Sequence, residues 1–245
     1  MKIIVHGAAG RMGTEVIKLI KAENSGLELA AAVDAFATDG NMLAHLADFN
    51  GEADCIIDFS NHAATACLVD YAVSKNVPLV VATTGQTPEE MKLIENAAEK
   101  IPVFFSANMS LGVALLCNLA KTAAAAFPNA DIEIVEKHHN RKLDVPSGTA
   151  LMLANAVKEA RPEAEYLIGR HENGKRRPEE IGIHSLRLGN VVGEHEVIIS
   201  TDTQIISLKH EAQSRNLFAE GAVEAARFLC GKPAGLYKMS DLISK

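Results

Sequence analysis

The chain has 245 residues, 48% of them hydrophobic and 22% charged, which is ordinary for a globular protein with a substantial core. Its net charge of −7 argues against nucleic acid as a partner, because phosphate backbones are bound by clustered Lys and Arg. No run of roughly 18 apolar residues indicates a membrane span. An apolar strand begins at Lys2, so we expect no signal peptide and a cytoplasmic location. The cysteines form no Cys-x-x-Cys pair, and we expect buried free thiols at Cys55, Cys67, Cys117 and Cys230.

The first half alternates short apolar runs with helical patterns. Strands are predicted at Lys2–His6, Leu27–Val33, Asp54–Phe59, Pro78–Ala82 and Ile101–Phe105. Helices are predicted from Gly13 to about Ala22, from Asn61 to Ser74, and after Thr87, where Thr-Pro-Glu-Glu is a strong helix start. Apolar strands separated by helices favour a doubly wound, Rossmann-type parallel sheet covered on both faces.

The pattern changes after Ser110. A long apolar helix (111–127) precedes a strand (132–137) and a helix capped by Ser147. Three strand-like runs then follow one another directly, at 183–188, 194–200 and 204–212, which predicts an antiparallel sheet. A last helix (218–230) is expected to return to the first domain. We therefore expect a dinucleotide-binding domain of residues 1–109 plus 215–245, and an inserted α+β domain of residues 110–214.

A glycine turn follows the first strand. Gly7, Gly10 and Gly13 stand between strand and helix, where glycine lets the backbone approach a pyrophosphate. Asp34 ends the second strand and can accept hydrogen bonds from ribose hydroxyls. The alternative is a plain strand–turn–helix with a surface Asp. Ala35 follows where an arginine would help to hold a 2′-phosphate, which favours NADH over NADPH, although Arg11 could supply a positive charge.

The segment Glu136–Thr149 (EKHHNRKLDVPSGT) combines chemistry suited to a small anion. If His138 and His139 are both extended, their side chains point to opposite faces, which disfavours joint metal ligation and indicates separate roles. Lys142 adds positive charge, and the helix start at Ser147 favours an anion. The alternative is a polar loop with a capped helix. No metal is expected.

These motifs together resemble the dihydrodipicolinate reductase family, also called 4-hydroxy-tetrahydrodipicolinate reductase. The resemblance rests on the glycine turn with Arg-Met inside it, on Thr-Thr-Gly, on Ala-Asn-Met-Ser-Leu-Gly-Val and on the segment HHNRKLDVPSGT, and it spans nearly the whole chain. Ala82 and Met109 depart from the glycine and phenylalanine that are common in the family. The resemblance implies reduction of a ring dicarboxylate by NADH or NADPH in diaminopimelate and lysine biosynthesis. It also implies a homotetramer joined through the sheets of the second domain.

The resemblance also implies residue roles. His138 would be the general acid/base and Lys142 a proton donor, while Arg215 matches a family arginine near the substrate. Substrate would be bound by His139, Ser147, Gly148 and Thr149. The cofactor would contact Gly7, Ala8, Ala9, Gly10, Arg11, Met12, Asp34, Ala82, Thr83, Thr84, Ser106, Ala107, Asn108 and Met109.

The sequence leaves room for two other functions. One is a different two-domain NAD-dependent dehydrogenase acting on a small acidic substrate. The other is a redox-sensing regulator that binds NADH, which would need a basic helix-turn-helix, and the sequence has no such pattern.

Overall fold

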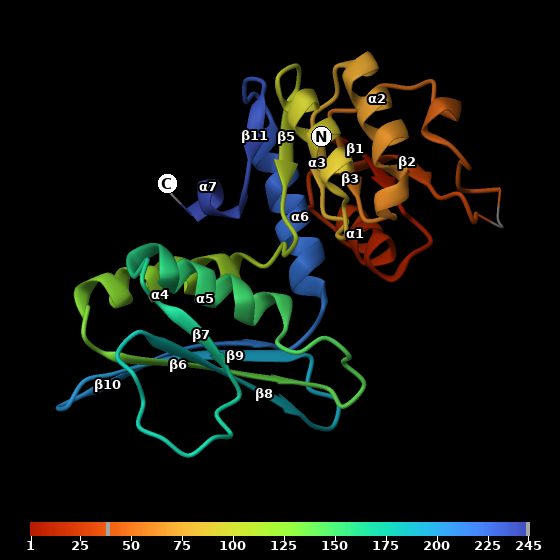
Figure 1. Cartoon of the computed structure of the whole chain (residues 1–245). Coiled ribbons are helices and arrows are strands. Elements are labelled where there is room, and N and C mark those ends of the chain that lie inside the picture. Colours follow the sequence, from red (N-terminus) through yellow and green to blue (C-terminus); the bar gives the residue numbers. More distant parts are fainter. Residues whose placement is uncertain (38–39, 244–245) are drawn as a thin grey trace. The chain divides into compact units, whose positions relative to one another are not determined.

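The computed structural model describes residues 1–37 and 40–243 and divides into two compact units. Unit 1 comprises Met1–Leu111 and Arg215–Lys245, and unit 2 comprises Gly112–Ser214. Each unit has its own sheet (Figure 1).

Unit 1 contains a six-stranded sheet in the order β11-β5-β4-β3-β1-β2. All its neighbouring strands pair in parallel, which confirms the predicted parallel sheet. The strands are β1 (Lys2–His6), β2 (Glu28–Val33), β3 (Cys55–Asp58), β4 (Leu79–Val81), β5 (Pro102–Phe105) and β11 (Gly235–Tyr237). The short strand β11 was not predicted.

Helices cover both faces of this sheet, as the doubly wound fold requires. Helices α1 and α6 contact each other, and α6 also packs on β3, β4 and β5, while α2 contacts α3. Short helical segments complete the unit. The bounds are α1 (Arg11–Lys21), η1 (Leu46–Asp48), η2 (His62–Ala64), α2 (Thr65–Lys75), α3 (Pro88–Ala98), α6 (Asn216–Leu229) and α7 (Met239–Ile243).

Unit 2 contains a mixed sheet, so the prediction of an antiparallel sheet is wrong in part. The strand order is β10-β9-β6-β8-β7. Strand β6 lies between β8 and β9, pairing in parallel with β8 and antiparallel with β9, and only β9 and β10 form the expected hairpin. The strands are β6 (Asp131–His138), β7 (Glu165–Ile168), β8 (Glu180–Arg187), β9 (Gly193–Ser200) and β10 (Ile205–Ala212).

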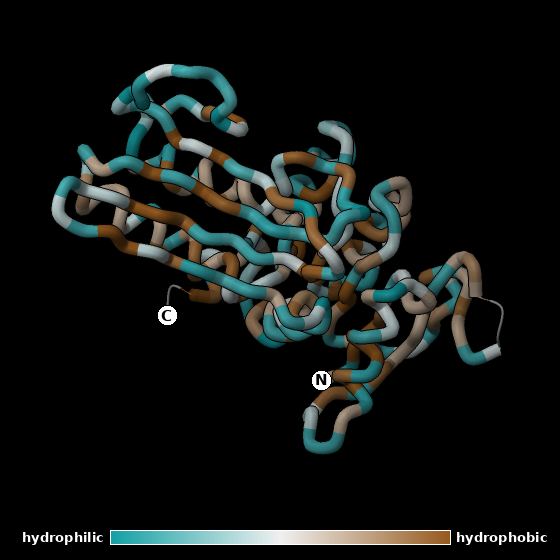
Figure 2. The backbone as a smooth tube through the Cα atoms, turned by 90° about the horizontal axis from the view of Figure 1, so that it is seen from below, coloured by the Kyte–Doolittle hydropathy of each residue, from teal (hydrophilic) through white to brown (hydrophobic). Residues whose placement is uncertain are grey.

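Two helices cover one face of this sheet, α4 (Leu111–Ala126) and α5 (Gly148–Ala160) (Figure 1). Along β6 buried and partly exposed residues alternate, because successive side chains of a strand point to opposite faces. Hydrophobic and hydrophilic stretches accordingly follow one another along these strands in Figure 2. The inner face forms a core with the helices through Ile132, Ile134, Ile181, Ile183, Val197 and Ile199.

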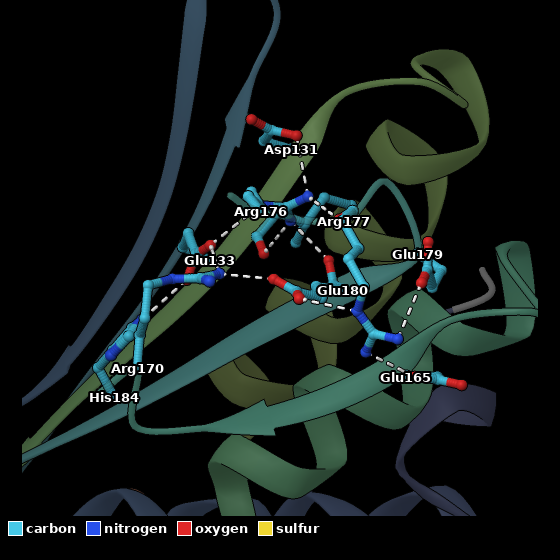
Figure 3. Close-up of polar contacts among 10 residues, drawn as sticks. Asp131, Glu133, Glu165, Arg170, Arg176, Arg177, Glu179, Glu180 and His184 are labelled. Atoms are coloured by element: carbon cyan, nitrogen blue, oxygen red, sulfur yellow. Dashed lines mark hydrogen bonds and ion pairs between the residues drawn. The ribbon is translucent and has the colours of Figure 1, made fainter. Parts of the chain in front are cut away.

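The opposite face of β6 carries a network of charges, which we call the arginine cluster: Asp131, Glu133, Glu165, Arg170, Arg176, Arg177, Glu179, Glu180 and His184 (Figure 3). Arg176 donates to Glu133, and Arg170 and Arg177 donate to Glu180. A Cβ on Gly182 would lie 1.7 Å from a Glu133 carboxylate oxygen, so glycine there lets that carboxylate lie over β8. The cluster fastens the segment between β7 and β8 to the sheet.

Both predicted helix caps are present. Thr87 accepts a hydrogen bond from the Glu90 N–H, and Ser147 accepts one from the Ala150 N–H. All the cysteines are free, but the expectation of burial is wrong for Cys67 and Cys230, which are exposed. Among the described residues, no helix is both long and apolar enough to cross a membrane.

Candidate active site

In the parallel sheet of unit 1, β1 lies between β2 and β3. The chain adds β2 on one side of β1 and all later strands on the other side, so the strand order reverses at β1. Ligands of such sheets bind outside the carboxyl ends of the strands at this switch point. The glycine turn follows β1, Asp34 follows β2, and Phe59 follows β3. The fold thus gathers three chain segments that are far apart in sequence.

The glycine turn depends on the absence of side chains. Gly7 has φ of 79°, and a Cβ there would lie 2.6 Å from the carbonyl carbon and oxygen of Phe59. A Cβ on Gly13 would lie 2.2 Å from the Gly7 oxygen. The turn therefore packs backbone against backbone and leads directly into the N-terminus of α1, where N–H groups and the helix dipole favour an anion.

Asp34, at the end of the second strand, is hydrogen-bonded to this turn. Its carboxylate accepts the Ala9 N–H at 3.0 Å and the Phe36 N–H at 2.9 Å, and the residue is only 9% exposed. A carboxylate has about four acceptor positions, so these two bonds leave capacity for ligand hydroxyls.

Two cavities of about 450 Å³ each lie in unit 1. The first cavity is lined by Arg11, Met12, Phe59, Ser60, Asn61, Ala82, Thr83, Thr84, Ala107, Asn108, Met109 and Phe218. The second cavity is lined by His6, Gly7, Ala9, Gly10, Asp34, Ala35, Phe36, Phe59, Ser60, Asn61 and Ala64. The structure therefore brings most of the predicted cofactor contacts to these two cavities.

Two predicted contacts, Ala8 and Ser106, do not line either cavity. Ala8 is fully buried, and Ser106 is 9% exposed, with its Oγ donating to the Asn108 carbonyl. Residues 59–61 line both cavities, although no role was predicted for them. The missed signal is their place after a predicted parallel strand, since the same rule that indicated 82–84 applies there.

In unit 2, β6 ends at His138 and places it on the same buried face as Glu136. His139 directly follows the strand. The His138 Nδ1 lies 2.5 Å from Glu136 Oε2. His138 is 8% exposed and Glu136 is completely buried.

Glu136 also accepts hydrogen bonds from residues of two other segments. Arg187 of β8 donates to both carboxylate oxygens, at 2.8 and 2.7 Å, and the Ser147 N–H donates at 3.2 Å. Burial alone would raise the pKa of Glu136, but the hydrogen bonds from His138 and Arg187 outweigh it and lower the pKa. Glu136 therefore links His138 to the start of α5.

His195 of β9 lies beside His138, with ring centroids 5.1 Å apart in an edge-to-face arrangement. Its Nε2 is 3.0 Å from the Ser147 Oγ. Burial, with a smaller contribution from the charge of His138, lowers the pKa of His195 to about 4. His195 is therefore neutral at neutral pH.

Two further predicted residues of unit 2 lie before and at the start of α5. Lys142 forms an ion pair of 2.8 Å with Asp144. Gly148 begins the helix, and a Cβ there would meet no atom within 4 Å, so the approach to this helix end is open. Arg215 is exposed and directly precedes α6, in unit 1.

Sequence reasoning assigned no role to Glu136, Arg187 or His195. The period of two was the available signal for Glu136, because it places residues 136 and 138 on the face of Ile132 and Ile134. Arg187 and His195 reach this site only through the pairing of β8 and β9 with β6, which local sequence does not determine.

Family models match almost the whole chain. Residues 1–109 match the N-terminal part of dihydrodipicolinate reductase, and residues 112–243 match its C-terminal part.

Similar proteins carry related names. The 4-hydroxy-tetrahydrodipicolinate reductase of Caldanaerobacter subterraneus subsp. tengcongensis is 48% identical, covering 100% of this chain and 99% of that protein. The reductase of the same name from Clostridium tetani is 41% identical, covering 100% and 97%. A dipicolinate-bound dihydrodipicolinate reductase from Paenisporosarcina superposes with a TM-score of 0.79 at 25% identity, covering 97% of each chain.

Proposed function

The chain belongs to the dihydrodipicolinate reductase family of nicotinamide-dependent oxidoreductases, and we propose that it reduces 4-hydroxy-tetrahydrodipicolinate to tetrahydrodipicolinate with loss of water. This reaction would place the protein in diaminopimelate and lysine biosynthesis. The observation that carries the proposal is 48% identity over the full length of a reductase of that name. The buried Glu136–His138 pair beside the N-terminus of α5 is a site that fits the chemistry.

The cofactor is proposed to bind in unit 1, and two features of the fold fit it. The glycine turn has no room for side chains, as expected where a pyrophosphate approaches backbone. The Thr83 Oγ1 is buried in the wall of the first cavity with no hydrogen-bond partner among the described residues, so it can serve a ligand amide or hydroxyl. When bound, the reduced nicotinamide supplies a hydride.

The substrate is proposed to bind in unit 2. His139 and the first residues of α5, Ser147, Gly148 and Thr149, would bind its carboxylates, aided by the positive end of the helix dipole. His138 would act as general acid/base and Lys142 as a proton donor. Dipicolinate, the ligand of the Paenisporosarcina reductase, is a ring dicarboxylate of the expected class.

NADH is proposed as the preferred cofactor. The Asp34 carboxylate would repel a 2′-phosphate, and the exposed side chain after Ala35 is Phe36 rather than a cation. Comparing KM for the two cofactors tests this preference, and a clearly lower KM for NADPH would overturn it.

We also propose a homotetramer joined through the face of the five-stranded sheet that carries the arginine cluster. Apolar side chains on that face support this assignment: Leu186 is exposed, and Val135 and Ile198 are partly exposed. Sedimentation equilibrium tests it, and a monomer at micromolar concentration would refute it.

A coupled assay tests the function directly. Aspartate semialdehyde and pyruvate are mixed with the preceding synthase, and absorbance of NADH or NADPH is followed after this protein is added. We expect oxidation that depends on all components. Oxidation of neither cofactor, or faster oxidation with other acids than with this substrate, would refute the proposal.

His138→Ala and Lys142→Ala test the residue roles. Each is expected to lower kcat about 100-fold or more, because a general acid–base group is lost. NADH binding, measured by fluorescence titration, should remain unchanged, since both residues belong to unit 2. Turnover near that of the unsubstituted protein in both variants would contradict the assignment.

A further inference from the structure

We propose that Glu136 is the positioning residue of His138, holding Nδ1 as the N–H nitrogen and leaving Nε2 to exchange the proton with the substrate. This inference rests on the proposed function and deepens it. Glu136 touches no substrate in this arrangement and acts only through His138.

Glu136 accepts hydrogen bonds from several donors. Arg187 donates to both of its carboxylate oxygens, and the Ser147 N–H donates to Oε1. The side chain is completely buried, and a buried carboxylate is stable as an anion only when such donors compensate the lost water. Glu136 is therefore ionised and can only accept hydrogen bonds.

An acceptor at 2.5 Å requires a proton on the imidazole nitrogen that faces it. His138 Nδ1 is therefore the donor, whether the ring is neutral or charged. The Nε2 atom is therefore the one that is protonated and deprotonated. This is the same division of labour by which a buried carboxylate orients a catalytic histidine in hydrolases.

A Cβ on Gly193 of β9 would lie only 3.1 Å from the His138 Nε2, so glycine leaves room beside this nitrogen. Gly193 lies two residues before His195 on the same face of β9, and His195 packs edge-on against the same ring. The ring is thus bounded on one side by Glu136 and flanked by β9.

Charged and titratable groups reach His138 from several elements. Glu136 comes from β6 itself, Arg187 from β8 and His195 from β9, while Lys142 and Asp144 belong to the segment before α5. The bidentate pair with Arg187 keeps Glu136 from taking up the Nδ1 proton. In the proton transfer, the N–H bond at His138 Nε2 breaks and a bond from this proton to the substrate forms. Glu136 remains a carboxylate throughout.

Nuclear magnetic resonance of the full protein tests the tautomer without any turnover. The chain has nine histidines, so the His138 signals are assigned by comparison with His138→Ala. In ¹⁵N-labelled protein at a pH where the ring is neutral, we expect Nδ1 to be protonated and Nε2 to be unprotonated. The opposite tautomer would overturn the proposal, even if the reductase activity itself proved absent.

Glu136→Gln supplies the kinetic test, because an amide presents N–H groups toward donors and cannot stabilise an imidazolium. We expect kcat to fall about 10- to 100-fold with KM for NADH unchanged. Glu136→Gln should also shift the His138 ring away from the Nδ1-protonated tautomer in the same resonance measurement. Glu136→Asp keeps the charge and the acceptor, and should recover part of the lost kcat.

Glu133→Gln is the matched control. Glu133 lies on the opposite face of β6 and likewise contacts a histidine, His184 at 2.8 Å, and an arginine, Arg176 at 3.2 Å (Figure 3). We expect its kcat and the tautomer of its His138 to match those of the unsubstituted protein. Unchanged kcat and tautomer in Glu136→Gln would overturn the proposal, and if this variant does not fold, the tautomer of the unsubstituted protein decides.

Discussion

Gly193 is the residue whose missing side chain matters most to His138. A Cβ there would lie 3.1 Å from Nε2 and 3.5 Å from Cδ2, and the ring cannot easily yield because Glu136 holds its other nitrogen. Gly193→Ala should therefore lower kcat about 10-fold or more through displacement of the ring. Steady-state kinetics with and without the substitution measure this effect.

The control for that prediction is Gly174→Ala, where an added Cβ would meet no atom within 4 Å. Its kcat should stay unchanged. Unaltered turnover in Gly193→Ala would mean that the ring shifts without loss, and that its position is less constrained than the contacts indicate.

Charged residues were the hardest to interpret from sequence. The residue types at positions 138, 142 and 147 indicated a site for a small anion, because histidine titrates near neutrality, lysine is positive and Ser147 begins a helix. Glu136 was different, since a glutamate in an alternating strand is usually on the solvent face. Its burial is possible because Arg187, 51 positions away in sequence, and the Ser147 N–H donate hydrogen bonds to the carboxylate.

At the scale of elements, the start of α3 shows how local sequence fixes structure. The Thr87 side chain accepts the Glu90 N–H at 3.2 Å, and the Glu90 carboxylate accepts the Thr87 N–H at 2.8 Å. Thr87→Ala removes half of this capping box and should lower the free energy of unfolding by about 1 kcal/mol. Urea unfolding measures this free energy. It is followed by circular dichroism, because the chain has no Trp for fluorescence.

Thr122→Ala is a suitable comparison, because Thr122 is exposed within α4 and donates to the Asn118 carbonyl in its own helix. Alanine favours a helix interior, so this variant should be as stable as the original or slightly more so. Equal losses in both variants would show that the cap itself contributes nothing.

Most elements of unit 1 were predictable, because the longer strands and helices carry their own signal of period, cap or glycine. The pairing in unit 2 was not. A run such as EHEVIIS has the same alternation whether its neighbour is the next strand or an earlier one, and β6 in fact separates β8 from β9. The short strands β7 and β11 were not predicted, because three or four residues are too few to show a period of two.

At the scale of the whole molecule, carboxylates with lowered pKa values link stability to pH. Hydrogen bonds from Arg170, opposed by burial and aided by Arg177, lower the pKa of Glu180 from 4.5 to about 2. A hydrogen bond from Lys137 likewise lowers the pKa of Glu194. The folded chain thus binds fewer protons than the unfolded chain in mild acid, so its stability must fall as protons are added.

The sign of this effect sets the pH window. For Glu180 the stabilisation is fully present above the unfolded value of 4.5 and is lost as the pH falls toward about 2. Thermal midpoints measured by circular dichroism should therefore drop steeply across that window. In Glu180→Gln the midpoint should be lower at neutral pH, and its further drop in acid should be smaller, because one titrating group is gone. A variant whose midpoint fell in acid as steeply as the original would show that Glu180 does not contribute to the acid sensitivity of the fold.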